Sequence, residues 1–416
     1  MSARLRIAHF VHRYPPALGG SEAYFARLSR HLAGRGHQVT VFTTTALDLE
    51  VFRGPGRVLP PGTTLEDGVS VRRFPLLRLP AQRWLLAVAS LLPVRGWQAL
   101  TLPWNPLSPA MWRAADGREC FDVVHATAFP YGWPLACGRR LARRLGVPFL
   151  LTPFLHTGDP EAPYDRTRRT FSHPALLDLA RSADHVFVQT EGEWQAFESP
   201  GVSRDRLVLQ GLGVDPAECT GGDRERARAA WGVGPGDVVV GHLANLSAAK
   251  GTLDLLLAAR RAWGSCVDRL TLVLAGPEST AFRRSAPELP HLKRVRCLGE
   301  LDAHQKRDFF AGIDVFALPS RADSFGLVLL EAWANGLPNL AYRAGGVPWV
   351  IRDEIDGLLV RCGDIDGLAA LLCRLTEDAQ LRRRLGEAGR ARTRTEFRWE
   401  EKLRIVEDTL LSSCER

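Results

Sequence analysis

Residues 319–338 carry the sequence PSRADSFGLVLLEAWANGLP. An apolar run from Ile313 to Leu318 precedes this stretch and ends at a proline and a polar loop. A helix-periodic apolar pattern then begins near Ser324 and stops at residues 336–338, Gly-Leu-Pro, which are typical of a helix end. The stretch therefore predicts a strand, a loop and a helix, in that order.

The predicted helix has an open N-terminus. Asp323 and Ser324 suit its first turn, and the loop before it holds nothing large enough to cover the exposed backbone amides. Such amides, together with the helix dipole, favour phosphate when the helix follows a parallel strand. Glu331 lies about two turns further down the helix. An acid pair by itself is more often a capping aspartate and a solvated glutamate.

The whole string resembles the Glu-x7-Glu signature of retaining glycosyltransferases of the family 4 type, also known as glycosyl transferases group 1. Asp323 stands in for the first glutamate of that signature and keeps its charge. The resemblance implies the α/β GT-B fold, in which two Rossmann-like, doubly wound domains face a cleft.

The length and composition agree with two globular domains. A chain of 416 residues can form two cores, and its content of 45% hydrophobic and 24% charged residues excludes disordered and collagen-like classes. The net charge is +8, and the excess lies before residue 217, with 25 basic and 18 acidic residues against 29 and 28 after it. These arginines lack interleaved aromatic residues, so we expect no nucleic acid partner.

The cysteines and the N-terminus indicate the compartment. Eight cysteines occur without a Cys-x-x-Cys pair or a matching histidine spacing, so neither a zinc site nor a disulfide framework is expected. Residues 1–10 lead straight into a strand without an apolar signal segment. We therefore expect a cytoplasmic protein.

Residues 84–104 form an apolar, tryptophan-bearing segment that is too short and too interrupted to span a bilayer. The segment either forms a core helix and loop or lies on a membrane surface, and we favour the core. The second alternative implies peripheral contact with the inner membrane face and suits a lipid-linked acceptor.

The first residues predict a βαβ unit. A strand at Ile7–Val11 is followed by Gly19 and Gly20, a helix to about residue 32, and a strand at Val39–Phe42. Two glycines before a helix allow a ligand to approach the backbone amides, although a plain turn explains them equally well. No Gly-x-Gly-x-x-Gly fingerprint is present. The opening resembles that of family 4 enzymes, where the glycine loop faces the cleft.

Two histidines, His125 and His156, fall at the carboxyl ends of predicted strands, where ligands bind in open α/β folds. A lone histidine is more often structural, but two at equivalent positions favour a ligand site. His156 also matches the position at which family 4 enzymes place a histidine beside the donor sugar.

Further candidates lie after the strands of the second half. Lys250, followed by glycine, matches the lysine of the family's Gly-Arg-Leu and Lys-Gly string. Asn245 occupies the arginine position and can donate a hydrogen bond without supplying charge. Gly276 and Leu298 also follow strands, and Leu298 matches the position that receives the base through backbone groups.

We expect three parts: residues 1–216 as an N-terminal acceptor-side domain, 217–395 as a nucleotide-sugar-binding domain, and 396–416 as a helix that packs back on the first. Residues 211–215 resemble the family's inter-domain connection.

The resemblance implies a role for each candidate. Lys250, the amides at Phe325, Gly326 and Leu327, and Gly19 with Gly20 would hold the diphosphate, and Ser324 would also bind substrate. Asp323 and His156 would position sugar hydroxyls, while Glu331 would hold the ribose; His125, Asn245, Gly276 and Leu298 complete the substrate-binding set. The leaving phosphate oxygen would itself assist deprotonation of the acceptor hydroxyl, which belongs to a glycan or a lipid-linked sugar.

No cofactor or metal is expected beyond the nucleotide-sugar donor. Asp364 and Asp366 resemble an Asp-x-Asp metal motif, but they directly precede an amphipathic helix and are interpreted as its cap. Two alternatives remain: a catalytically silent GT-B scaffold or nucleotide-sugar-binding protein, which Asn245 and the short Asp323 favour, and a nucleotide-sugar epimerase of related fold.

Overall fold

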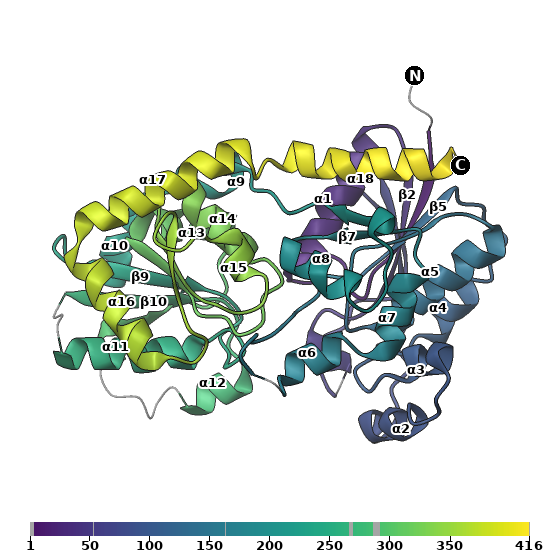
Figure 1. The fold of residues 1–416 in the computed structure, drawn as a ribbon, viewed down its shortest axis with the longest axis horizontal. Coiled ribbons are helices and arrows are strands. Elements are labelled where there is room, and N and C mark those ends of the chain that lie inside the picture. Colours follow the sequence, from purple (N-terminus) through teal and green to yellow (C-terminus); the bar gives the residue numbers. More distant parts are fainter. Residues whose placement is uncertain (1–3, 53, 163, 266–268, 286–291, 416) are drawn as a thin grey trace. The chain divides into compact units, whose positions relative to one another are not determined.

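The computed structural model describes residues 4–52, 54–162, 164–265, 269–285 and 292–415. The chain divides into two compact units (Figure 1). Unit 1 comprises Met1–Leu155, Arg169–Gln210 and Leu403–Arg416, and unit 2 comprises His156–Arg168 and Gly211–Lys402. The boundary after residue 210 lies six residues before the predicted one. Residues 156–168, expected in the N-terminal domain, belong to unit 2.

Unit 1 contains an eight-stranded sheet in the order β3-β4-β2-β1-β5-β6-β7-β8, parallel except for β3. Its strands are β1 (Arg6–Phe10), β2 (Gln38–Thr44), β3 (Gly62–Glu66), β4 (Val69–Phe74), β5 (Val123–Ala126), β6 (Phe149–Leu151), β7 (His185–Val188) and β8 (Leu207–Leu209). Its helices are α1 (Gly20–Gly34), α2 (Gln82–Ala89), α3 (Arg95–Thr101), α4 (Pro109–Ala114), α5 (Gly132–Leu145), α7 (Pro174–Arg181) and α8 (Glu191–Glu198), with the short η1 (Leu49–Phe52) and η2 (Arg204–Arg206).

Alternation along β1 distributes the core of unit 1 over both faces of the sheet. Ala8 and Phe10 join the large apolar cluster that includes α5, while the His9 ring lies 5.2 Å from the Phe25 ring of α1. This period of two is expected for a strand buried on both faces.

Unit 2 contains a six-stranded, wholly parallel sheet in the order β11-β10-β9-β12-β13-β14. Its strands are β9 (Val238–Leu243), β10 (Leu270–Ala275), β11 (Val295–Cys297), β12 (Val315–Leu318), β13 (Asn339–Tyr342) and β14 (Gly357–Val360). Its helices are α9 (Pro216–Cys219), α10 (Arg224–Trp231), α11 (Thr252–Ser265), α12 (Thr280–Ser285), α13 (Ala303–Gly312), α14 (Leu327–Ala334), α15 (Val347–Val350), α16 (Ile365–Glu377) and α17 (Ala379–Thr395), with the short η4 (Leu292–Arg294).

Helices cover both faces of this second sheet (Figure 1). Val315 and Ala317 of β12 join the apolar cluster with α11 and α16, while the Phe316 ring lies 5.8 Å from Phe310 of α13. Asp364 Oδ1 accepts a hydrogen bond from Gly367 N at 2.8 Å, which confirms the predicted cap of α16.

Two helices contribute to both units, namely α6 (Arg166–Phe171) and α18 (Trp399–Cys414). Within unit 1, Glu407 of α18 accepts from Arg35 Nε at 3.1 Å and lies 3.1 Å from His31 Nε2. Cys414 Sγ lies 3.4 Å from Asp122 O. The C-terminal part of α18 therefore packs on α1 and beside the start of β5.

The preference for residues 84–104 as core was wrong for most of the segment. Trp84 is 66% exposed and Leu91 is 77% exposed, and the buried residues of the segment are Leu86, Ala99, Thr101 and Leu102. The apolar pattern indicated burial, but the short helices α2 and α3 present most of their large side chains to solvent.

Candidate active site in unit 2

The start of α14 leaves backbone amides open. The helix begins at Leu327, three residues after the predicted start at Ser324, because Gly326 adopts the left-handed conformation, with φ 86°, as its N-cap. No side chain of the described residues caps the helix. Among the described residues, no protein group accepts a hydrogen bond from the N–H of Phe325, Gly326 or Leu327. These amides and the helix dipole suit an anion.

Close backbone packing brings the loop that carries Lys250 against the loop before α14. A Cβ on Gly251 would lie 1.8 Å from Pro319 O, so only glycine fits there. Arg321 N donates to Ala249 O at 3.0 Å and ties the two loops together. Gly251 is therefore required for the packing of the two loops, and Lys250 supplies a positive charge beside them.

Two further glycines, Gly345 and Gly346, pack against the loop before α14. A Cβ on Gly346 would lie 1.7 Å from Ser324 O, and Gly346 N donates to Asp323 O at 2.7 Å. Gly345 N donates to Gly158 O at 2.8 Å. The segment that follows His156 is therefore hydrogen-bonded to the same pair of glycines that contacts the loop before α14.

These contacts bring Lys250, Asp323 and His156 together, although they come from three distant segments. The Lys250 ammonium forms an ion pair with Asp323 Oδ1, and the two side chains are 29% and 15% exposed. His156 interacts electrostatically with both and forms a hydrogen bond with the backbone of Ala322. The structure thus assembles the predicted catalytic set within one unit.

The cluster sets the protonation of its members. Burial by itself would raise the pKa of Asp323, but the attraction of Lys250, its hydrogen bond and His156 lower that pKa below its ordinary value. Burial, and then the charge of Lys250, lower the pKa of His156 to about 4. At neutral pH Asp323 is therefore ionised and His156 is neutral, so the imidazole can donate one hydrogen bond and accept another.

Glu331 of α14 is held by a residue that the sequence did not indicate. Lys306 Nζ of α13 lies 2.6 Å from Glu331 Oε1. The other carboxylate oxygen, Oε2, is buried, and within the described chain it has no hydrogen-bond partner. Buried acceptors are nearly always satisfied, so Glu331 Oε2 calls for a donor such as a ligand hydroxyl. Nothing local in the sequence marks Lys306, because its partner lies on another helix.

The remaining candidates of unit 2, Asn245, Gly276 and Leu298, differ in which of their groups a ligand can reach. Asn245 is exposed in the loop after β9. Gly276 is buried, and its N–H donates to Gly299 O at 2.7 Å, so that amide is not open to a ligand; a substrate contact through its other backbone atoms stays a prediction. Leu298 N donates to Leu274 O at 2.9 Å, which leaves the Leu298 carbonyl for a base.

In unit 1 a buried ion cluster organises the loop before α1. Glu22 is 2% exposed and lies 2.5 Å from Arg13 and 3.2 Å from His12. Burial opposes its ionisation, yet His12 and Arg13 lower the pKa of Glu22 to about 2. A Cβ on Gly19 would lie 2.2 Å from Glu22 Oε2, whereas one on Gly20 would meet nothing within 4 Å. Gly19 therefore accommodates Glu22, and exposed Gly20 leaves room for a ligand.

His125 does not contact solvent, so its predicted substrate contact must be withdrawn. The residue is fully buried, and its Nε2 lies 2.8 Å from Thr152 Oγ1. Its ring lies between 5.0 and 5.4 Å from the rings of Phe25, Phe187 and His9. Burial, with a smaller effect of His9, holds the pKa of His125 well below its ordinary value. It is a neutral core residue.

Comparisons with known proteins identify the class. A glycosyl transferase 4-like domain model matches residues 19–213, and a glycosyl transferases group 1 model matches residues 223–392. D-inositol 3-phosphate glycosyltransferase from Acidothermus cellulolyticus is 30% identical, over 86% of this chain and 78% of the relative. The enzyme of that name from Mycobacterium marinum is 28% identical, over 96% and 81%.

Solved structures share the fold. Anabaena Alr3699/HepE in complex with UDP and glucose has a TM-score of 0.73 at 20% identity and covers 98% of this chain and 100% of its own. Sucrose-phosphate synthase from Thermosynechococcus elongatus has a TM-score of 0.72 at 22% identity, with 98% of both chains covered. The predicted two-domain GT-B fold is confirmed.

The protein is thus a glycosyltransferase, an enzyme that transfers a sugar. More specifically, the chain belongs to the glycosyl transferases group 1 family, as its sequence resemblance predicted.

Proposed function

We propose that this glycosyltransferase takes its sugar from a nucleoside diphosphate sugar and transfers it to a hydroxyl with retention at the anomeric carbon, without a metal ion. The observation that carries the proposal is the convergence of His156, Lys250 and Asp323 on the loop before α14, next to backbone amides that have no partner in the described part of the chain. A cation beside open amides suits a diphosphate.

The diphosphate would bind at the start of α14 and at Lys250. The N–H groups of Phe325, Gly326 and Leu327 would donate to one phosphate, and the Lys250 ammonium would turn from Asp323 to the bridging oxygen. Charge builds on that oxygen as the sugar departs, so these fixed donors act most strongly in the transition state.

The nucleoside would bind further along α14. Glu331 Oε2 would accept a hydrogen bond from a ribose hydroxyl, while Lys306 holds the other oxygen in place. The Leu298 carbonyl would contact the base. A neighbour of the same fold was solved with UDP and glucose, which supports a donor of this kind.

The sugar would lie beside His156 and Asp323. Neutral His156 can bond a hydroxyl through donation or acceptance, and ionised Asp323 can accept from another hydroxyl. An ionised carboxylate near the sugar also favours an oxocarbenium-like transition state. The leaving phosphate oxygen would take the acceptor proton, which keeps the reaction on one face of the ring and gives retention.

A metal-free clamp is part of the proposal. In the part of the chain that the structure describes, no three His, Cys, Asp or Glu residues form a group suited to a metal ion. Lys250 and the amides of α14 would supply the positive charge instead.

The test is a thermal-shift measurement with UDP, GDP and ADP, each with and without EDTA, on wild type and Glu331→Gln. A ligand that binds only the folded state raises the melting temperature. We expect one nucleotide to raise it in the presence of EDTA, and the shift to shrink in the Glu331 variant. No shift with any nucleotide, or a shift that EDTA abolishes, would contradict the proposal.

A further inference from the structure

Unit 1 exposes a concentrated apolar surface on α2, α3 and the chain that leads to them. We define the α2–α3 surface by nine large apolar residues that are 40–77% exposed: Leu77, Leu79, Trp84, Leu85, Val88, Leu91, Leu92, Val94 and Trp97. They make up nine of the sixteen exposed large apolar residues in the described chain, within a stretch of twenty-one positions. Scattered exposed leucines are ordinary, but such a concentration indicates an interaction site.

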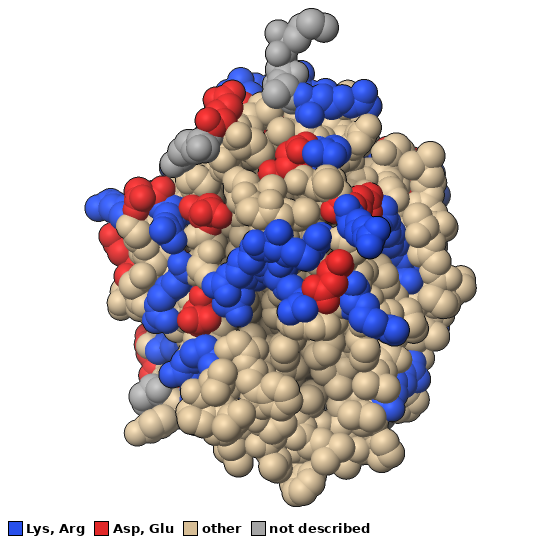
Figure 2. Space-filling model, turned by 90° about the vertical axis from the view of Figure 1, so that its right-hand side faces the viewer, with Lys and Arg blue, Asp and Glu red and all other residues tan. Residues whose placement is uncertain are grey.

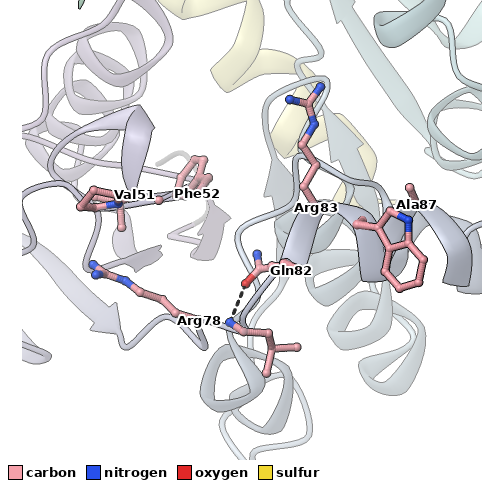
Figure 3. Close-up of a pocket in the computed structure, with 11 residues that line it drawn as sticks. Val51, Phe52, Arg78, Gln82, Arg83 and Ala87 are labelled. Carbon is pink, nitrogen blue, oxygen red and sulfur yellow. Dashed lines mark hydrogen bonds between the residues drawn. The ribbon is translucent and has the colours of Figure 1, made fainter.

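Helix α2 has little packing of its own. It has eight residues, and Leu86 is its one buried side chain. A cavity of about 730 Å³ lies between η1 and the start of α2, lined by Val51 and Phe52 on one side and by Arg83 and Ala87 on the other (Figure 3). A short helix obtains most of its stability from packing of an apolar face. Among the residues that the structure describes, most of the surface of α2 is left without such packing.

The charged residues of the segment that carries this surface have one sign. Residues 68–115 contain six arginines and no lysine, aspartate or glutamate. Arg78, Arg83 and Arg95 are exposed, and none of the described carboxylates forms an ion pair with them. Figure 2 shows a band of Lys and Arg side chains, with some Asp and Glu among them, across this face of the molecule, and a broad area with few charged side chains below it.

We propose that the α2–α3 surface docks on the surface of an anionic lipid bilayer. Apolar side chains would enter the boundary between headgroups and acyl chains, with Trp84 and Trp97 at the depth that tryptophan prefers. The unpaired arginines would contact anionic headgroups, which attract each nearby basic residue. No helix among the described residues is long and apolar enough to cross a bilayer.

The charge distribution argues against a second copy of the chain as the occupant. A two-fold contact places the same surface on both sides. It would bring the arginines of one acid-free segment against those of another, with no carboxylate from residues 68–115 to pair with them. A bilayer supplies the missing negative charge. The proposal goes beyond the sugar-transfer reaction and does not depend on the donor.

Flotation with vesicles tests the proposal on the full chain. Wild type is mixed with phosphatidylcholine vesicles that contain or lack phosphatidylglycerol, and the bound fraction is measured at low and high salt. We expect binding to the anionic vesicles that weakens with salt, and at least about tenfold weaker binding to the neutral vesicles.

Two pairs of variants separate apolar insertion from charge. Trp84→Ser with Leu91→Ser should weaken binding at least about tenfold, whereas Leu65→Ser with Trp349→Ser removes the same residue types elsewhere and should leave it unchanged. All four side chains are exposed, so their loss leaves the cores intact.

For charge, Arg78→Glu with Arg83→Glu is compared with Arg260→Glu and Arg383→Glu in unit 2. Each change lowers the net charge by two, so both double variants carry +8 − 4 = +4. The first pair should lose on the order of 25-fold in vesicle affinity, at roughly fivefold for each basic residue near an anionic surface. The second should lose only a few-fold.

Four results would overturn the proposal: no binding of wild type to anionic vesicles, equal binding to neutral vesicles, equal losses in a test pair and its control, or self-association. For the last, sedimentation velocity without lipid would show a wild-type dimer and a monomeric Trp84→Ser, Leu91→Ser variant.

Discussion

Replacing Lys250 with alanine tests the contact assigned to the leaving group. The ammonium is already held in the half-buried cluster by its ion pair with Asp323, so it needs little rearrangement to meet a diphosphate. Removal of one such preorganised electrostatic contact costs about 10²–10³ in rate, or roughly 2.7–4 kcal/mol. We expect kcat of Lys250→Ala to fall toward the upper end of this range, because Asn245 supplies no charge at the neighbouring motif position.

The same substitution should change the pH profile. Lys250 is one cause of the low pKa of both Asp323 and His156, so its loss raises both pKa values. Activity that needs an ionised Asp323 and a neutral His156 is lost as the pH falls through those values. The acid limb of the kcat profile should therefore move to higher pH in the variant.

Lys306→Ala is the matched control, because Lys306 is also half-buried and also holds a carboxylate of unit 2. Its partner Glu331 is assigned to the ribose, which does not change charge during the reaction. We expect Lys306→Ala to weaken donor binding about tenfold and to leave kcat within a few-fold. The assay combines steady-state kinetics with donor affinity from calorimetry. A Lys250→Ala enzyme with kcat within a few-fold of wild type, or the same kinetic profile for both variants, would refute the assignment.

The remaining predictions concern the neighbouring residues. Asp323→Asn should mainly lower kcat and Glu331→Gln should mainly raise the donor Kd, because the hexose ring gains charge in the transition state and the ribose does not; kinetics and calorimetry on both variants check this. Asn245→Arg should keep or increase kcat, since it adds a cation where relatives carry one, and a tenfold loss would contradict that. Gly346→Ala should lower the free energy of unfolding in urea by roughly 1–3 kcal/mol, because its Cβ would lie 1.7 Å from a backbone oxygen. His156 has a pKa lowered from 6.5 to about 4 in the folded state. Below pH 6.5 the unfolded chain therefore binds more protons at His156 than the folded protein does. The free energy of unfolding is highest above about pH 6.5 and decreases as the pH falls toward 4. His156→Gln should flatten this loss, as measured by urea unfolding at neutral and acid pH.

Local patterns in the sequence predicted the fold, because each strand and each helix is a continuous segment whose apolar residues follow the period of that element. The strand, loop and helix around residues 313–338 follow from apolar periodicity and from the closing Gly336 and Pro338. The predicted start of the helix, Ser324, was three residues too early. Asp323 and Ser324 resemble a cap, but Asp323 instead pairs with Lys250, and the left-handed Gly326 starts the helix.

The site was less predictable, because its contacts join residues far apart in the chain. Motif positions indicated Lys250 and Asp323, which are 73 residues apart, but nothing indicated Lys306 as the partner of Glu331. Both His125 and His156 were predicted to contact a ligand because both follow the carboxyl end of a predicted strand. The rings that surround His125 come from other elements of unit 1, so its burial is a property of tertiary packing.

The exposed α2–α3 surface shows a second limit. Apolar residues such as Trp84 and Leu91 indicate burial from the sequence, and only the structure shows that no described part of the chain covers them. Arg78, Arg83 and Arg95, which stand among the apolar residues of this segment, were the signal that argued against core, because arginine is seldom fully buried unless it is paired.

The configuration of the first product tests the central claim most directly. The donor that raises the melting temperature is incubated with the enzyme and EDTA, with water or a simple hydroxyl compound as acceptor, and ¹H NMR follows the anomeric proton before mutarotation. We predict a first-formed product with the same anomeric configuration as the donor, and its loss in Lys250→Ala. A product of inverted configuration, or turnover that stops when EDTA is added, would contradict the metal-free retaining transfer proposed for this site.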